Sequence, residues 1–295
     1  MVKYPIGMAS FREIRNGGYR YVDKTMYIHQ LVSLGKYFFL SRPRRFGKSL
    51  LISTMECYFR AERELFRGLA IDSLESDEWT EHPVLRLDFT RRGYNTPEDL
   101  NKILGDTLDK WEKEYSSPNP DDSPSGRFNR LIGDIYEQTG RKVVILIDEY
   151  DSPIVDAHDN PELEVANRRT LHDFYRVMKA NEDYLKFVFL TGVGKIGQIN
   201  VFSGLNNLKD ISLHSDYSAI CGITTQELLD NFHEGIEGLG QGCGWTFGRT
   251  LQELKTQYDG YHFTESLIDV YNPYSVVNAC LLYTSPSPRD YAASR

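Results

Sequence analysis

The segment RPRRFGKSL at 42–50 contains residue types whose spacing could bind phosphate. It follows the apolar run YFFL at 37–40, so a strand delivers a Gly-Lys-Ser tripeptide into a helix. In such a loop, backbone N–H groups surround the phosphates, the lysine reaches their outer oxygens and the hydroxyl holds Mg²⁺. The helix N-terminus adds its own preference for anions. We therefore expect nucleotide binding by Arg42, Pro43, Arg44, Arg45, Phe46, Gly47, Lys48, Ser49 and Leu50.

Two carboxylates follow a second apolar run, VVILI at 143–147. Ligands bind at the carboxyl ends of strands in open α/β sheets, so Asp148 is expected to hold Mg²⁺ opposite Ser49. Glu149 is placed to orient or deprotonate the attacking water. Taken alone, the pair is slightly better explained by a turn cap and a solvent-facing glutamate. Together with the Gly-Lys-Ser segment, it favours a metal ligand and a general base.

Further polar residues are weaker catalytic candidates. Thr191 ends a buried strand, where it could sense the γ-phosphate or hold the catalytic water, although an ordinary strand-ending threonine explains it nearly as well. Arg45 is the first candidate for an arginine finger. Arg44, Arg168 and Arg169 are alternatives, and each of these arginines is also explained as a surface or loop-bracing residue.

The elements that must position these residues alternate along the chain. We expect strands at 36–40, 84–89, 143–147 and 186–190, and helices at 48–60, 96–115, 127–139 and 162–181. This order predicts an α/β fold with a mainly parallel sheet and helices on both faces. The strand at 84–89 lies between the Gly-Lys-Ser strand and the Asp-Glu strand, and a glutamate follows the aspartate. Both features indicate the ASCE branch of P-loop NTPases.

The pattern loosens after residue 222. Thr224 to Glu227 is typical of a capped helix start, whereas the six glycines in 235–248 favour a loop or mobile insertion. We expect a core at 1–222 and a partial, mostly helical lid region at 223–279. Residues 280–295, beginning CLLYTSPSPRD, resemble translated sequencing adapter, so they are expected to be a non-native tail that interrupts the natural protein.

Seven segments together resemble the predicted AAA-ATPase-like family. They are YRYVDKT at 19–25, FLSRPRRFGKSLL at 39–51, LIDEYDSPI at 146–154, FLTGVGKIG at 189–197, FSGLNNLKDIS at 202–212, YDGYHF at 258–263 and YNPYSVVNA at 271–279. Arg42, which replaces the first glycine of the usual phosphate-loop pattern, belongs to that family's signature. The resemblance implies an AAA-type fold, ATP as the nucleotide, and a following domain similar to PD-(D/E)XK nucleases that this chain lacks.

Composition narrows the function classes. The 295 residues include 40% hydrophobic and 26% charged residues, which is ordinary for a globular protein. A net charge of −8 argues against a surface that generally coats nucleic acid, although a local basic groove stays open. There is no apolar run of membrane-spanning length, and four scattered cysteines indicate reduced thiols in the cytoplasm.

These observations predict a Mg²⁺-dependent ATPase that regulates or powers an attached effector. That effector is expected to be a nuclease, with DNA reached through the missing C-terminal domain. The alternative is a nucleotide-gated switch that binds ATP without significant turnover. The partners expected are nucleotide and a second copy of the chain, with no membrane.

Overall fold

The computed structural model describes residues 2–75, 79–91, 93–117, 123–194, 207–264 and 268–282. Its centre is a five-stranded parallel sheet in the order β2-β3-β4-β1-β5. The strands are β1 (Tyr37–Ser41), β2 (Val84–Asp88), β3 (Val143–Asp148), β4 (Leu185–Gly192) and β5 (Lys209–Asp210). The expected α/β fold of the P-loop NTPase type is therefore confirmed.

The position of the strand at 84–89 differs from the expectation. Strand β2 lies between β1 and β3 along the chain, but among the described strands it pairs only with β3 and forms an edge of the sheet. Strand β4 separates β1 from β3 instead. Parallel neighbours need a crossover, so chain order does not give sheet order. As a result, the tips of β1, β4 and β3 lie next to one another.

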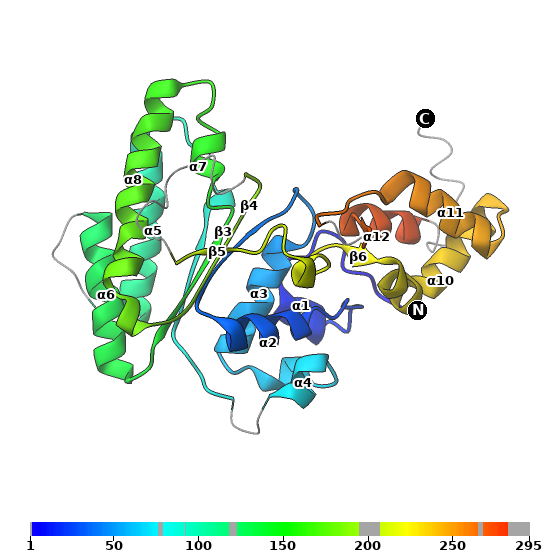
Figure 1. Cartoon of the computed structure of the whole chain (residues 1–295), viewed down its shortest axis with the longest axis horizontal. Helices are drawn as coiled ribbons and strands as arrows, with labels where there is room; N and C mark the ends of the chain where they lie inside the picture. The colour runs from blue at the N-terminus through cyan, green and yellow to red at the C-terminus, as the bar shows by residue number, and fades with distance from the viewer. Residues whose placement is uncertain are drawn as a thin grey trace.

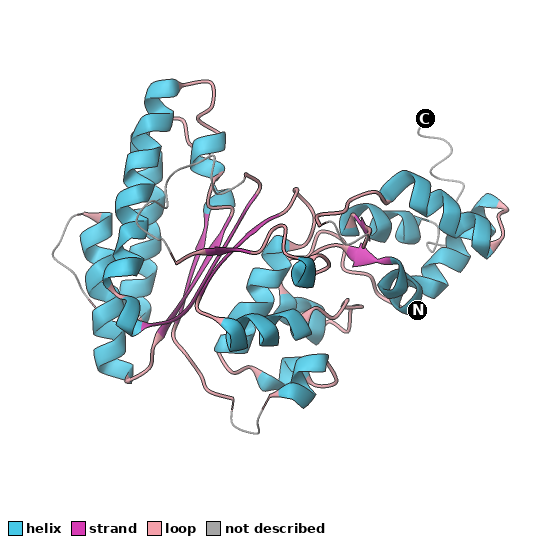
Figure 2. Ribbon diagram, in the orientation of Figure 1, coloured by secondary structure: helices cyan, strands magenta, loops and turns pink. Residues whose placement is uncertain are grey.

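Helices cover both faces of the sheet (Figures 1 and 2). One face is covered by α5 (Pro97–Glu114), α6 (Pro124–Thr139) and α8 (Pro161–Ala180), and the other by α1 (Phe11–Asn16), α2 (Thr25–Leu34), α3 (Lys48–Phe59) and α4 (Ala70–Leu74). Every residue of β3 is buried, because alternate side chains enter the two apolar layers. The expected helices are confirmed, although α6 begins at Pro124, three residues earlier than predicted.

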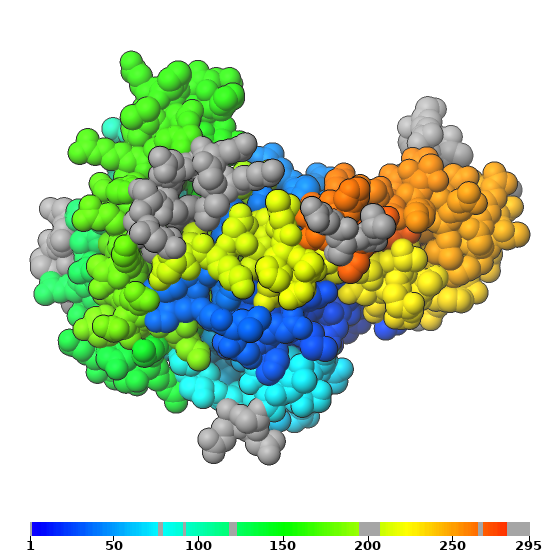
Figure 3. Space-filling view, viewed as in Figure 1, coloured from blue at the N-terminus to red at the C-terminus, as the bar shows by residue number. Residues whose placement is uncertain are grey.

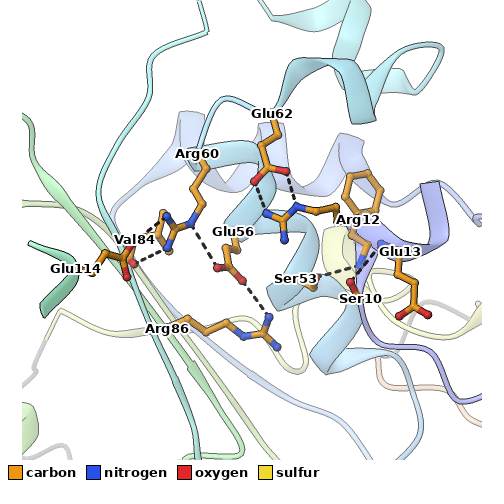
Figure 4. A network of polar contacts seen from close by, with 11 residues as sticks. Ser10, Arg12, Glu13, Ser53, Glu56, Arg60, Glu62, Val84, Arg86 and Glu114 are labelled. Carbon is orange, nitrogen blue, oxygen red and sulfur yellow. Dashed lines mark hydrogen bonds and ion pairs between the residues drawn. The ribbon is translucent and has the colours of Figure 1, made fainter. Parts of the chain in front are cut away.

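A network of charged side chains holds the C-terminal part of α3 (Figure 4). Glu56 of α3 forms ion pairs with Arg86 of β2 at 3.0 Å and with Arg60 at 3.4 Å. Arg60 also contacts Glu114 at the end of α5, and Arg12 of α1 pairs with Glu62. The helix that follows the phosphate loop is thus tied to a strand and to two other helices.

Residues 223–282 form a separate helical region, called the lid here (Figures 1 and 3). It consists of α10 (Thr225–Cys243), α11 (Phe247–Tyr258) and α12 (Pro273–Leu282), with a small antiparallel pair of β6 (Ile223–Thr224) and β7 (Val270–Tyr271). The lid has its own apolar core, which also includes Tyr4. Helix α12 extends three residues beyond the expected boundary at 279.

The glycine-rich segment 235–248 was expected to be a loop, and this prediction was wrong. Most of it is the second half of α10, and α11 begins before it ends. A Cβ atom at Gly235 would lie 2.8 Å from the Cβ of Cys280, and one at Gly240 would lie 2.7 Å from Oγ1 of Thr250. These glycines are therefore helical residues that allow α10 to approach α12 and α11 closely.

Within the described ranges, no helix combines the length and the apolar character that a bilayer span requires.

Candidate nucleotide-binding site

The phosphate loop joins the end of β1 to the start of α3, as the sequence predicts. Gly47 is the N-cap of α3 and has a φ of 95°, a conformation that side-chain-bearing residues rarely adopt. Arg45 has a φ of 68°, which is strained for a residue other than glycine. The carbonyl of Phe46 accepts a hydrogen bond from the N–H of Gly222, at 3.1 Å. The loop is therefore fixed both by its own glycine and by the segment that leads into the lid.

Lys48 connects this loop to the tip of β3. Its side chain is 3% exposed, and its Nζ donates to the carbonyls of Arg42 and Pro43 at 2.9 and 3.1 Å. The same Nζ forms an ion pair with Oε1 of Glu149 at 2.9 Å. The structure thus brings together the two residues that sequence reasoning assigned to phosphate binding and to water activation.

Asp148 and Thr191 meet across neighbouring strands. Both side chains are buried, and the Thr191 hydroxyl donates to Oδ1 of Asp148 at 2.6 Å. The tips of β3 and β4 are in register, with Ile147 opposite Leu190, which places the following residues side by side. Thr191 therefore orients the carboxylate that was expected to hold Mg²⁺. The sequence suggested neither this contact nor this role.

Glu149 occupies an unusual backbone conformation. Its φ is 52°, in the left-handed region, where a non-glycine residue is strained by about 1–3 kcal/mol. Burial raises the pKa of its carboxyl above the ordinary value, while the nearby Lys48 ammonium opposes that rise. Strain at a strand tip beside a buried lysine is typical of functional positions.

A cavity of about 380 Å³ opens in front of the loop. Its walls come from Gly47, Lys48 and Ser49, from Glu149, from the N-terminal segment 5–9, and from the lid. The lid contributes Ile223, Phe232, Pro273, Tyr274 and Val277. A concave site of this size, apolar on one side and charged on the other, fits a nucleoside joined to phosphates.

The Arg42 side chain does not face this cavity, contrary to the expectation that it binds the nucleotide. It is 1% exposed and donates to the carbonyls of Ser212 at 2.7 Å and Tyr217 at 3.0 Å. Its guanidinium also lies 4.0 Å from the ring centre of Phe263. Burial lowers the pKa of Arg42. This arginine therefore braces the loop from behind, in the place where the usual pattern has glycine.

The other predicted loop residues occupy different surroundings. Phe46 is buried against Tyr261 and Phe263, and Leu50 is half-buried at the cavity wall. Arg44 is exposed and lines a second cavity of about 320 Å³, which it shares with Glu149. Phe89, Thr90, Ser152 and Asp156 complete the described lining of that second cavity.

The arginine-finger candidates differ in whether they lie beside a cavity. Arg45 lines the main cavity, and its guanidinium lies 4.3 Å from the ring centre of Tyr274. Arg168 forms an ion pair with Glu164 of the same helix at 2.6 Å, and Arg169 is exposed. The structure thus places only Arg44 and Arg45, of these four, beside a described cavity.

Sequence reasoning missed two residues at the site. Asp151 is 1% exposed, and its carboxylate accepts from the N–H of Val193 at 3.0 Å, which fixes the turn after β4. Lys24 lines the cavity, and its Nζ contacts both carboxylate oxygens of Glu227 at 2.6 Å. The signals were the repeated acidic residue in DEYD and the lysine in YVDKT, but nothing local indicates their partners.

Two comparisons show which known proteins this chain resembles. A protein of Azotobacter chroococcum mcd 1, described as an uncharacterized protein in the vnfD 5′ region, is 37% identical over 293 residues. The match covers 98% of this chain, which spans about half (53%) of the length of that relative. The family model described as predicted AAA-ATPase matches residues 5–202, which contain the phosphate loop, the Asp148-Glu149 pair and Thr191. The chain therefore belongs to the predicted AAA-ATPase family.

Proposed function

We propose that the protein binds ATP with Mg²⁺ and hydrolyses it. The observation that carries this proposal is the ion pair between Lys48 and Glu149 at the edge of a cavity of nucleotide size. It brings a phosphate-binding lysine and a half-buried carboxylate with a raised pKa to one edge of the cavity. Arriving phosphates would take over the lysine and free the carboxylate to activate a water beside them.

Each residue has a distinct part in the proposed reaction. The backbone of residues 43–48 surrounds the phosphate chain, and Lys48 neutralises its charge. Ser49 and Asp148 would hold Mg²⁺, which would supply positive charge to offset the negative charge that develops during phosphoryl transfer. Thr191 keeps the Asp148 carboxylate in one orientation through its short hydrogen bond. Glu149 accepts the proton of the attacking water.

A second candidate function is supported by the same ion pair. While Glu149 contacts Lys48, its carboxylate is engaged and does not face a water. A protein in which a bound nucleotide left that contact in place would bind ATP without significant turnover and would act as a switch. The two functions differ in whether Glu149 leaves Lys48 when the phosphates arrive.

Two variants test the proposal and separate the alternatives. Lys48→Ala is expected to abolish ATP binding in calorimetry, because the loop loses its cation. Glu149→Gln is expected to keep binding and to lose about 10²–10⁴-fold of the phosphate-release rate, the usual contribution of a general base. Normal turnover by Glu149→Gln would remove Glu149 from the mechanism. ATP binding without measurable turnover in the wild type would favour the switch.

The wider role is a proposal of the same kind. We infer that residues 1–222 act as the ATPase core, that residues 223–279 are the native part of the lid, and that residues 280–295 are not native. We also infer that the module serves an attached effector, a nuclease acting on DNA, in the cytoplasm and with a second copy of the chain. The greater length of the Azotobacter relative supports a further domain in that protein. Phosphate release measured on the Azotobacter relative, with and without DNA, tests this role.

A further inference from the structure

Three side chains of the phosphate loop contact aromatic residues at 261–274. Arg42 lies over Phe263, Phe46 packs edge-on against Tyr261 and Phe263, and Arg45 lies over Tyr274. Tyr274 is in the first turn of α12, whose start is fixed by a hydrogen bond from the N–H of Ser275 to Oδ1 of Asn272 at 3.2 Å. The loop and the lid therefore share one aromatic contact surface.

The three contacts differ in how easily they can be broken. Arg42 and Phe46 are each 1% exposed, and Arg42 also donates to three carbonyl groups. Arg45 is exposed, and Tyr274 is 37% exposed. Among the described residues, the Arg45 guanidinium has no hydrogen bond or ion pair, and its contact there is with the Tyr274 ring. Arg45 is therefore the loop residue whose side chain can leave the lid at low cost.

A phosphate chain would offer Arg45 a stronger partner. Arg45 lines the same cavity as Lys48 and Ser49, so phosphates held by the loop lie within the cavity that its guanidinium borders. Charge-assisted bonds between arginine and phosphate are stronger than an exposed cation–π contact. The tyrosine ring and the phosphates thus compete for one guanidinium.

We propose that Arg45 is a phosphate-binding residue that Tyr274 of the lid holds away from the phosphates until a nucleotide displaces the ring. By this exchange the lid senses whether phosphates occupy the loop. The inference rests on the proposed nucleotide binding and adds to it a named binding residue and its competitor. It also assigns a purpose to an arginine at a strained position where glycine would suit the backbone better.

The competition predicts that removal of the ring tightens nucleotide binding. Calorimetry with a non-hydrolysable ATP analogue and Mg²⁺ should give a Kd about two- to fivefold lower for Tyr274→Leu than for the wild type, because an exposed cation–π contact is lost from the free protein only. Tyr274→Phe keeps the ring and should keep the wild-type Kd. Arg45→Met should weaken binding of the analogue. In an Arg45→Met background, Tyr274→Leu should no longer tighten it.

Adenosine provides the control for the shape of the cavity, because it has no phosphate for Arg45. The affinity for adenosine should not rise in Tyr274→Leu. The ratio of the affinity for the ATP analogue to the affinity for adenosine should therefore increase in this variant. An unchanged ratio in a Tyr274→Leu protein that melts like the wild type would overturn the competition while leaving nucleotide binding intact. Failure of the wild type to bind the analogue at all would overturn the proposed function, and this inference with it.

Discussion

The two sides of the cavity are built differently. On the strand side, Asp148, Thr191 and Lys48 are each no more than 3% exposed and are joined to neighbours by contacts of 2.6 to 3.1 Å. On the lid side, the contacts to the core include a half-exposed cation–π pair and the ion pair of Lys24 with Glu227. The strand side is preorganised for one charge arrangement, whereas the lid side can change its contacts.

Burial is the physical reason for this difference. Buried hydrogen bonds act in a medium of low dielectric constant, and an unpaired buried group is costly, so the strand side has essentially one favourable arrangement. An exposed ring contact is worth little, and solvent replaces it readily. The proposed site, which would hold phosphate accurately and also respond to it, would use both kinds of contact.

The largest expected effect comes from removing the brace behind the loop. Arg42→Met should lower the free energy of unfolding by about 3 kcal/mol or more, because buried carbonyls of Ser212 and Tyr217 lose charge-assisted hydrogen bonds. Urea denaturation measures this loss. Arg44→Met, at an exposed neighbouring position, should change stability by less than about 0.5 kcal/mol. Equal stabilities for the two variants would show that Arg42 is no brace.

The next effect concerns the strand tips. Thr191→Val keeps the shape of the side chain but leaves Oδ1 of buried Asp148 without its donor, which should cost about 1–3 kcal/mol of stability. Thr191→Ser retains the hydroxyl and should lose clearly less in the same denaturation experiment. If valine and serine behave alike, the hydrogen bond is not what stabilises this edge of the sheet.

On the lid side, the Lys24–Glu227 pair should be weaker than the strand-side contacts. Glu227→Gln leaves the buried Lys24 ammonium without its countercharge and should cost about 1–2 kcal/mol, less than for a fully buried pair because the Glu227 side chain is 24% exposed. Hydrogen exchange should locate the loss in α10. Glu237→Gln, at a more exposed position of that helix, is the control. A loss spread evenly over the core would contradict a local lid contact.

The smallest effect is the pH dependence of stability at Glu149. Its pKa in the folded protein is raised, so ionisation of Glu149 disfavours the fold. The protonated form of Glu149 stabilises the fold fully below the pKa that this residue has in the unfolded protein. That stabilisation is lost as pH rises through the higher pKa of Glu149 in the folded protein. Glu149→Gln should therefore gain melting temperature relative to the wild type as pH rises from the ordinary glutamate pKa through the raised pKa of the folded protein. The control Glu137→Gln, at an exposed position, should show no such trend. If the gain in melting temperature of Glu149→Gln became smaller as pH rose, the pKa of Glu149 in the folded protein would be lowered rather than raised.

Much of the site could be predicted because its signals are local. The run VVILI before Asp148 predicts a strand buried on both faces, and the Thr224–Glu227 spacing predicts a capped helix, both of which the structure confirms. The glycine-rich segment 235–248 misled the same reasoning, because a glycine that loosens an isolated helix also allows two helices to pack closely.

The sequence by itself indicated which residues are candidates for the proposed chemistry, and it determined which elements hold them. Gly47-Lys48-Ser49 begins a helix after a strand, and Asp148-Glu149 ends another strand, because these patterns depend only on neighbours along the chain. Only the tertiary structure decided their partners. The insertion of β4 between β1 and β3 places Thr191 beside Asp148, and residues more than a hundred positions away turn Arg42 inward and hold Arg45 against the lid. Contacts between distant segments follow from strand order and packing, which no local pattern specifies.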